Sequence, residues 1–414
     1  MNRKRRLRIR SRRDFLLAHS PDRRLRLLYR IRHGVGWLCV IVTALFFLLN
    51  LDLLTPDSIK SIRSSLKAAA SHTTTDTTMI SYPSSSPDAL LPFGNAVALC
   101  SNGNLSIELP GSYTQMETEM SYADPVLRAS DRYLLTFDRG ANRFTVSNTL
   151  AQLFTHSTRS SISNADISNN GTIAVVTDEA GYKSAVTVYN IDNEQLYKWS
   201  SSDYYIMATA LSSDGSHLAL FCFKQDGLTL TSQLMFADTG SNAAPQSIAD
   251  MEDGLCVGLT FLGNNTVCAV CDNGLYVVKR NGTVRYSQSY TSDDLIAFDL
   301  SSHDSVALCT TSYSQEGRAE ITLLNSRGAL TRSPLVLAEK PDSISYYNGR
   351  LAVLSGDTVA FYNRSLRQID EQTGFSGASA VYMRSGNLCI ASFSSYARVL
   401  TIGQPLEDLN GTAE

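Results

Sequence analysis

A short pattern recurs along this chain and limits the folds that it can adopt. Its clearest copy reads A-L-S-S-D-G-S-H-L-A-L-F-C, from Ala210 to Cys222. An apolar run ends at Leu211, a Ser-Ser-Asp-Gly segment turns the chain, and a second apolar run follows. Asp214 and Gly215 suit that turn because Asp and Gly tolerate the positive φ that tight hairpins require. The pattern therefore predicts a β-hairpin.

The pattern occurs eight times. The other copies are Phe93 to Leu99, Ala129 to Leu135, Ile167 to Val176, Leu262 to Val270, Leu300 to Leu308, Tyr346 to Leu354 and Met383 to Ile390. A second turn, rich in Asn, Asp and Gly, alternates with them from Gly111 to Gly403, at a period of about 42 residues that holds about four short strands. This spacing is typical of WD40-like propellers. We predict an all-β fold, a β-propeller of four-stranded blades, with eight blades favoured and seven as the alternative.

Two other all-β folds fit the period less well. A pair of β-sandwiches gives no reason for a sequence pattern that repeats at a fixed period, and the coils of a β-solenoid are much shorter than this period. The propeller is predicted over residues 89–407, followed by a tail at 408–414. Its last repeat lacks an outermost strand, and Thr78 to Tyr82 is the segment expected to supply that strand and close the ring.

The N-terminal 33 residues differ in charge from the rest of the chain. They carry thirteen Lys or Arg against two Asp, and the net charge of the whole chain is only -3. Nucleic-acid binding and anionic-lipid binding are two interpretations of this basic segment. A topology signal is favoured because an apolar run follows immediately. Residues 1–34 are therefore predicted to be cytoplasmic, and no nucleic-acid partner is expected.

The apolar run at 35–54 is predicted to be a transmembrane signal anchor. Crossing the hydrocarbon core as a helix takes about 20 residues. A cleaved signal peptide is the rival, but no small-x-small cleavage site follows the run. The predicted anchor residues are Val35, Trp37, Leu38, Val40, Ile41, Leu45, Phe46, Phe47, Leu48 and Leu49. Basic residues before the run, and almost none after it, predict a cytoplasmic N-terminus and an extracytoplasmic propeller.

Residues 55–88 are predicted to join the anchor to the propeller. Thr55-Pro56 is typical of a helix start, and Ile59, Ile62 and Leu66 recur at helical spacing. Ser, Thr and Pro then dominate from Ser71 to Pro87, which indicates a flexible linker.

Residues that carry chemistry are few in the predicted propeller. Its only histidines are His156, His217 and His303, and the last two lie in or beside repeat turns. Convergence of blades at the axis would allow a metal site or a Ser-His-Asp arrangement, although a solvated turn histidine is the favoured interpretation. No catalytic residue, cofactor or metal ligand is predicted.

Carboxylates also recur at turns, and a propeller can direct such side chains into its central channel for acid–base work or cation binding. They are Asp131, Asp178, Asp214, Asp272, Asp304 and Asp357. Since Asp is a common turn residue, the structural interpretation is favoured. An enzyme with a channel site built from these carboxylates stays open as the alternative.

Six of the eight cysteines are predicted to be buried thiols in the apolar strand after each repeat turn. They are Cys100, Cys222, Cys268, Cys271, Cys309 and Cys389. Cys268-x-x-Cys271 has the spacing of a redox or zinc motif. Residues three apart on a strand point to opposite faces, so an unbroken strand excludes chelation or bridging by these two. Disulfides between neighbouring blades stay open.

Six Asn-x-Ser/Thr patterns are glycan acceptors only in a eukaryotic secretory pathway. They lie at Asn104, Asn170, Asn264, Asn281, Asn363 and Asn410. Such patterns also arise by chance in Asn-rich turns, and a bacterial envelope is the favoured compartment.

The layout as a whole resembles a known family. A basic leader, one apolar span, a Ser/Thr linker and repeats such as L-S-S-D-G-S-H-L-A-L are similar to an uncharacterised, domain-of-unknown-function family of membrane-anchored propellers of Gram-positive bacteria. This resemblance implies no catalytic motif. The hairpin that ends L-Y-K-W-S, at Leu196 to Ser200, is similar to quinoprotein-like propeller repeats. Those repeats carry a Trp in most blades, whereas here only Trp199 occurs, so no quinone cofactor is expected.

Two functions follow from these features. The favoured one is a membrane-anchored, extracytoplasmic binding or scaffold module that contacts membrane lipid through its anchor and an envelope protein, peptide or glycan through its propeller. The alternative is a hydrolase or lyase that uses the turn carboxylates. Fold alone does not decide between them.

Overall fold

The computed structural model describes residues 37–38, 41, 78–82, 87–111, 113–251, 254–302, 304–312, 317–384 and 387–403. The chain divides into two compact units, 1–59 and 60–414. In the first unit Trp37, Leu38 and Ile41 are helical and exposed. No helix of the described residues is long and apolar enough to cross a membrane. The other predicted anchor residues, the 1–34 segment and the 408–414 tail lie outside the described residues.

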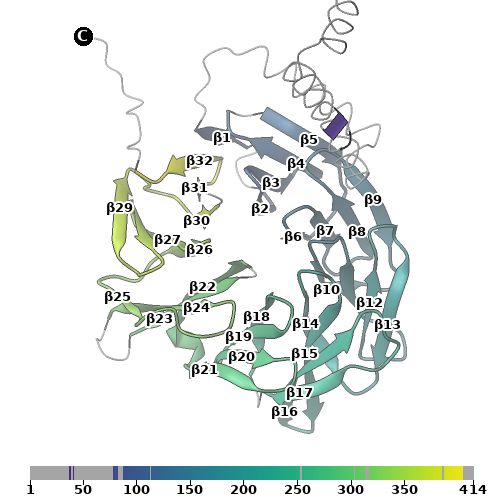
Figure 1. The fold of residues 1–414 in the computed structure, drawn as a ribbon. Coiled ribbons are helices and arrows are strands. Elements are labelled where there is room, and N and C mark those ends of the chain that lie inside the picture. The colour runs from purple at the N-terminus through teal and green to yellow at the C-terminus, as the bar shows by residue number, and fades with distance from the viewer. Residues whose placement is uncertain are drawn as a thin grey trace, which may run out of the picture. The chain divides into compact units, whose positions relative to one another are not determined.

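The second unit is an eight-bladed propeller of four-stranded antiparallel sheets, as the repeats predict (Figure 1). Blade 1 contains β2 (Ala89–Phe93), β3 (Ala96–Ser101), β4 (Asn104–Leu109) and β5 (Tyr113–Glu119). Blade 2 contains β6 (Pro125–Ala129), β7 (Leu134–Asp138), β8 (Arg143–Ser147) and β9 (Gln152–Ser157). Blade 3 contains β10 (Ile162–Ile167), β11 (Ile173–Thr177), β12 (Ser184–Tyr189) and β13 (Gln195–Ser201). Blade 4 contains β14 (Tyr205–Leu211), β15 (His217–Asp226), β16 (Thr229–Asp238) and β17 (Gln246–Asp250).

The second half of the ring repeats this arrangement. Blade 5 contains β18 (Cys256–Leu262), β19 (Thr266–Cys271), β20 (Gly274–Lys279) and β21 (Val284–Ser289). Blade 6 contains β22 (Leu295–Ser302), β23 (Ser305–Thr311), β24 (Ala319–Asn325) and β25 (Leu335–Leu337), preceded by the short 3₁₀ helix η2 (Ser292–Asp294). Blade 7 contains β26 (Ser343–Tyr347), β27 (Arg350–Ser355), β28 (Thr358–Asn363) and β29 (Gln368–Thr373). Blade 8 contains β30 (Ala380–Met383), β31 (Leu388–Ser392), β32 (Tyr396–Thr401) and β1 (Met79–Ser81).

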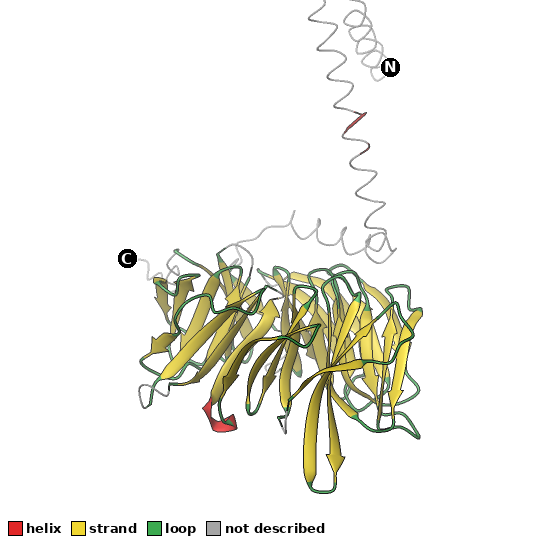
Figure 2. Cartoon of the chain, turned by 60° about the horizontal axis from the view of Figure 1, so that its bottom comes forward, coloured by secondary structure: helices red, strands yellow, loops and turns green. Residues whose placement is uncertain are grey.

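Turn residues make the hairpins that the repeat pattern predicts. Between β26 and β27, Tyr347 pairs with Arg350, so only Asn348 and Gly349 form the loop. Both residues have positive φ, +47° and +79°. This is the backbone that a two-residue hairpin needs and that Asn-Gly adopts at low cost. Ten-residue β15 and β16 form a longer hairpin that extends from one face of the disc (Figure 2).

Burial follows the position of a strand within its blade. The second strands β3 and β19 are buried at every residue, whereas the outer strand β21 contains no buried residue. A middle strand is covered on both faces because each sheet packs between two neighbouring sheets, so it is apolar almost throughout instead of alternating. Both faces of a middle strand therefore lie inside the protein.

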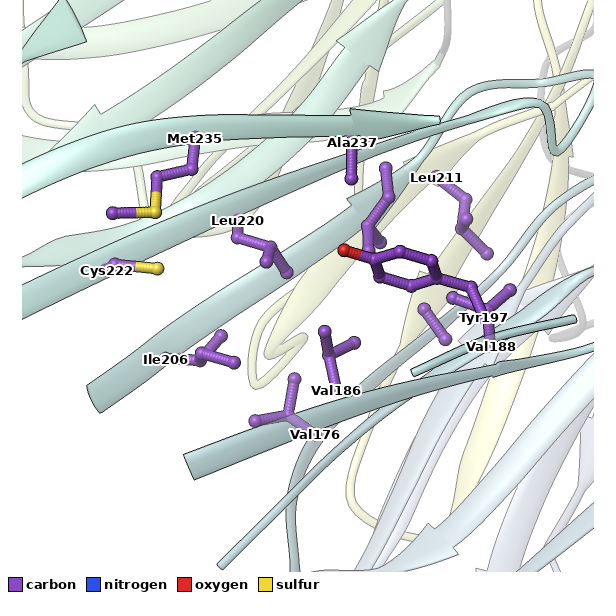
Figure 3. Packing of buried hydrophobic residues seen from close by; sticks show 12 residues of the cluster. Val176, Val186, Val188, Tyr197, Ile206, Leu211, Leu220, Cys222, Met235 and Ala237 are labelled. Atoms are coloured by element: carbon purple, nitrogen blue, oxygen red, sulfur yellow. The ribbon is translucent and has the colours of Figure 1, made fainter. Parts of the chain in front are cut away.

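Neighbouring blades pack face to face through aliphatic side chains. Between blades 3 and 4, Val186 and Val188 of β12 pack in one cluster with Leu218 and Leu220 of β15 (Figure 3). All four side chains are fully buried. Tyr197 of β13 completes this cluster at the outer side, where its hydroxyl donates a hydrogen bond to the Ala243 carbonyl at 3.0 Å.

The ring closes with a strand from before the first blade, as predicted for Thr78 to Tyr82. β1 pairs with β32 in blade 8, with Ile80 opposite Ala397. Met79 also accepts a hydrogen bond from the Gly111 amide of blade 1, at 2.9 Å. Ile80 is fully buried in a cluster that contains residues of blades 8 and 1. This three-residue strand therefore joins the two ends of the propeller.

Replacement of Ile80 by Ala should weaken ring closure. Loss of a fully buried Ile side chain leaves a cavity between two blades, and we expect the free energy of unfolding to fall by about 3 kcal/mol. Urea unfolding of the propeller, followed by circular dichroism, measures the change. Ile369→Ala is the matched control because Ile369 is 40% exposed in outer strand β29. Equal losses from the two variants would show that β1 does not stabilise the ring.

Candidate functional site

A cavity of about 750 Å³ lies where the inner strands of the blades meet. Its wall contains residues of all eight first strands or the turns directly after them. Blades 4 to 6 contribute an apolar side that includes Met207, Leu259 and Phe298. Blades 8 and 2 contribute two cationic side chains, Arg384 and Arg128, and blade 1 between them contributes Leu91, Pro92 and Phe93. The wall therefore offers both apolar surface and positive charge to a ligand.

Arg384 is the less exposed of the two cationic side chains in this wall. Its Nη2 donates to the Pro92 carbonyl at 3.0 Å, and its Nη1 approaches the Met383 carbonyl at 3.3 Å. Its Nε is buried without a hydrogen-bond partner, and no ion pair among the described residues includes it. Burial lowers the pKa of this guanidinium, with Asp299 acting in the opposite direction. A half-buried cation that forms no ion pair among the described residues is costly, so the site favours an acidic ligand group.

Other polar side chains of the inner strands bond to the next blade. The unpaired edge of each first strand leaves backbone amides without a strand partner. Asp166 of blade 3 accepts from the Leu211 amide of blade 4 at 2.7 Å. Asp299 of blade 6 accepts from the Tyr346 amide at 2.8 Å and from the Ser345 hydroxyl at 2.7 Å, both in blade 7. These carboxylates hold neighbouring blades together.

The six turn carboxylates do not gather at one place. Three of them, Asp131, Asp214 and Asp304, follow first strands, and the other three follow second strands. Because the strands are antiparallel, these two kinds of turn lie on opposite faces of the disc. The cavity wall includes Asp131 alone of the six, and its carboxylate accepts from the Asn169 amide group at 2.7 Å. Asp214 likewise accepts from Ser212, Ser216 and Asn264.

The histidines occupy separate blades. His156 of β9 packs against the rings of Phe144 and Tyr189, with centroids 5.1 and 4.8 Å away, and burial lowers its pKa. His217 of β15 contacts Asp238 through Nδ1 at 2.8 Å and Arg280 of blade 5 through Nε2 at 3.1 Å. His303 lies outside the described residues. Among the residues that are described, no group of three His, Cys, Asp or Glu side chains is placed to hold a metal ion.

The cysteines lie as the repeat pattern predicts. All six that were assigned to second strands are in β3, β15, β19, β23 or β31, and all are buried. β19 is unbroken, and Cys268 and Cys271 belong to different core clusters. The prediction that Cys268 and Cys271 point to opposite faces of the sheet is therefore confirmed. Sequence reasoning did not assign a place to Cys256, which begins inner strand β18 and lines the cavity.

A second hollow, of about 500 Å³, lies between the turns of blades 6 and 7. Its wall includes Asp304, Asn325, Asn348 and Asn363. Asn325 and Asn363 use their side chains to bond turn amides nearby. These polar groups stabilise turns, so the axial cavity is the better candidate site.

A protein-family model described as "Family of unknown function (DUF5711)" matches residues 69–387. The chain belongs to the DUF5711 family. The matched residues include β1 and nearly the whole ring, and they exclude the predicted anchor at 35–54. No curated protein matches the chain.

Solved structures show the same fold at low sequence identity. The C-terminal WD40 domain of Sif2 is 13% identical with a TM-score of 0.53, covering 79% of this chain and 99% of its own. BamB from Moraxella catarrhalis is 14% identical with a TM-score of 0.50, at the same coverage. Sqt1 from Chaetomium thermophilum, solved bound to the N-terminus of ribosomal protein L10, is 14% identical with a TM-score of 0.50 and covers 79% of this chain and all of its own. For this DUF5711 member these similarities establish the β-propeller fold alone.

The bonds between inner strands can be tested at Asp299. Asp299→Ala leaves the buried Tyr346 amide and Ser345 hydroxyl without their acceptor, so we expect the free energy of unfolding to fall by about 2 kcal/mol. Asp299→Asn keeps an acceptor oxygen and should lose less than half of that amount. Urea unfolding at neutral pH distinguishes the two variants. Equal losses would mean that the carboxylate charge, and not the hydrogen bonds, stabilises the junction.

Proposed function

We propose that this chain is a membrane-anchored binding module whose axial cavity holds a segment of a partner protein that carries a carboxylate. The observation that carries the proposal is the half-buried Arg384 guanidinium, which has two carbonyl contacts, a buried and unpaired Nε and no ion pair among the described residues. A carboxylate satisfies guanidinium donors with charge-assisted hydrogen bonds, which are about twice as strong as neutral ones.

The rest of the cavity wall suits a peptide better than a small ion. Opposite the cationic side, Leu259, Phe298 and Leu300 offer an apolar surface to a neighbouring side chain. A volume of about 750 Å³ is in the range of pockets that hold several side chains. Sqt1, a propeller with the same fold, was solved with a protein N-terminus bound, which is a precedent for peptide binding by this architecture.

The proposed location of the module is the outer surface of the cell membrane. The support is the sequence: thirteen basic residues precede an apolar run at 35–54, and a Ser/Thr/Pro-rich segment separates that run from the ring. The anchor would keep the propeller within reach of envelope proteins. The family match covers the ring and leaves the anchor to experiment.

Site-specific photocrosslinking in intact cells tests the binding site. Val257 lies in the cavity wall and is 51% exposed, so a photoreactive residue there should give a discrete adduct with one protein. Leu330 is 45% exposed outside the cavity wall and is the matched control position. Adding Arg384→Gln should reduce the Val257 adduct at least about tenfold, because a charge-assisted bond is worth about 1.5–3 kcal/mol.

Three outcomes contradict the proposal: equal adducts from both positions, an adduct that Arg384→Gln leaves unchanged, or an adduct with glycan instead of protein. Thermal unfolding of the Arg384→Gln variant checks that the ring still closes, since Arg384 also contacts Pro92 of blade 1. If the variant does not fold, binding of the crosslinked peptide with a free or an amidated carboxyl group to the unaltered protein gives the same comparison.

Membrane attachment has its own test. We expect the full chain to stay with membranes in alkaline carbonate and a chain that begins at residue 60 to be released. An impermeant biotinylating reagent should label a C-terminal tag in intact cells and leave an N-terminal tag unlabelled. Release of the full chain would disprove the anchor, and labelling of the N-terminal tag alone would reverse the orientation.

A further inference from the structure

Two cysteines of blade 5 face each other across adjacent strands. Cys256 is the first residue of β18, Cys271 is the last residue of β19, and their Cα atoms are register partners. Both side chains belong to the same core cluster between blades 4 and 5. They therefore lie on the same face of the sheet, unlike Cys268 and Cys271.

The hydrogen bonds beside this pair define its geometry. The Asp272 amide donates to the Leu255 carbonyl at 3.0 Å, and the Leu255 amide donates to the Asp272 carboxylate at 2.7 Å. Leu255 and Asp272 thus form the hydrogen-bonded position, and the adjacent Cys256–Cys271 pair is at a non-hydrogen-bonded position. Opposed Cα atoms at such a position are about 4.5 Å apart, within the range of about 4.4–6.8 Å that a disulfide spans.

The two thiols are also in contact. A hydrogen bond with Cys256, followed by burial, raises the pKa of the Cys271 thiol. The Cys256 thiol approaches the Gly258 carbonyl at 3.3 Å. Cys271 is fully buried, whereas Cys256 is 7% exposed and lines the axial cavity. A small reagent in the cavity therefore reaches Cys256 first, with Cys271 in position behind it.

We infer that Cys256 and Cys271 form a redox-active dithiol that closes to a disulfide between strands β18 and β19 of blade 5, with a small-molecule disulfide as the oxidant. The Cys256 thiolate attacks one sulfur of the reagent, and the other sulfur leaves as a thiolate that takes up the proton released by Cys256. The Cys271 thiolate then attacks Sγ of Cys256 and displaces the second small-molecule sulfur as a thiolate, which takes up the proton released by Cys271. Two protein thiols are oxidised, and one small-molecule disulfide is reduced to two thiols.

The remaining cysteines lack this arrangement. Cys268 lies on the same strand and is fully buried, but its register partners are Thr260 and Val277. Cys222 is opposite Ile206 and Gln233. Among the described cysteines, Cys256 and Cys271 are the only two that lie directly opposite each other on neighbouring strands. Cys268 is therefore a matched control, because it is on the same strand, equally buried and without a cysteine opposite.

Treatment of the full-length native protein with glutathione disulfide tests the inference. After denaturation, the number of free thiols should fall by two from the eight in the chain. Chymotryptic cleavage at Phe261 separates Cys256 from Cys271, so mass spectrometry should find a linked pair of peptides that reductant releases. Cys268→Ala should keep this linked pair, and Cys256→Ala or Cys271→Ala should lose it.

Thermal unfolding provides a second readout. A disulfide that closes a loop of about 15 residues should raise Tm by on the order of 5 °C in the oxidised protein. Reductant should reverse the shift, Cys268→Ala should keep it, and Cys256→Ala should abolish it. Eight free thiols after treatment, a linked pair that disappears in Cys268→Ala, or only glutathione adducts on Cys256 would overturn the inference. The peptide mapping of the unaltered protein decides the question even if a variant fails to fold.

Discussion

Closure of the ring is the constraint on which the rest of this structure depends. Each sheet is apolar on both faces, so it is stable only between two neighbours, and a ring gives every sheet two neighbours without a free end. The link that completes the ring is small. In β1, Ile80 packs between blades 8 and 1, and beyond it the Tyr82 hydroxyl hydrogen-bonds Ser392 of blade 8 at 3.0 Å. A short segment that lies far from blade 8 in the sequence thus completes the junction between blades 8 and 1. Without that junction, the apolar faces of these two blades would be exposed to water.

The same ring creates the candidate site. The first strand of each blade has an unpaired edge toward the axis, and its amides need acceptors. Asp166 and Asp299 supply acceptors to the following blade. Their carboxylates are therefore committed to structure, and an acid–base role for them would weaken the junctions. Arg384 differs because it satisfies carbonyls on both sides of the closing junction, Met383 and Pro92, and still has a donor to offer.

The sequence predicts the architecture well because the propeller depends on local patterns. Turn residues such as Asn348-Gly349 fix the hairpins, and their period fixes the number of blades. Because the last repeat lacks an outermost strand, the sequence also predicts that a segment from before the first repeat, Thr78 to Tyr82, supplies it. The site depends on positions that repeats do not encode. Arg384 follows an inner strand at a turn, where a sequence suggests exposure, and its burial comes from the approach of blade 1, almost three hundred residues earlier in the chain.

The cysteine pair shows the same limit at the scale of a single residue. Leu262 pairs with Thr266 and Gly258 with Val270, and continuing that register would place Val257, not Cys256, opposite Cys271. A bulge between Cys256 and Gly258 shifts the register by one residue and brings the two thiols together. A bulge also changes the direction of the strand and of its side chains, and Val257 is exposed in the cavity wall as a result. One local irregularity thus produces both the thiol pair and part of the cavity surface, so a disulfide at Cys256 would form directly beside the wall that a bound ligand contacts.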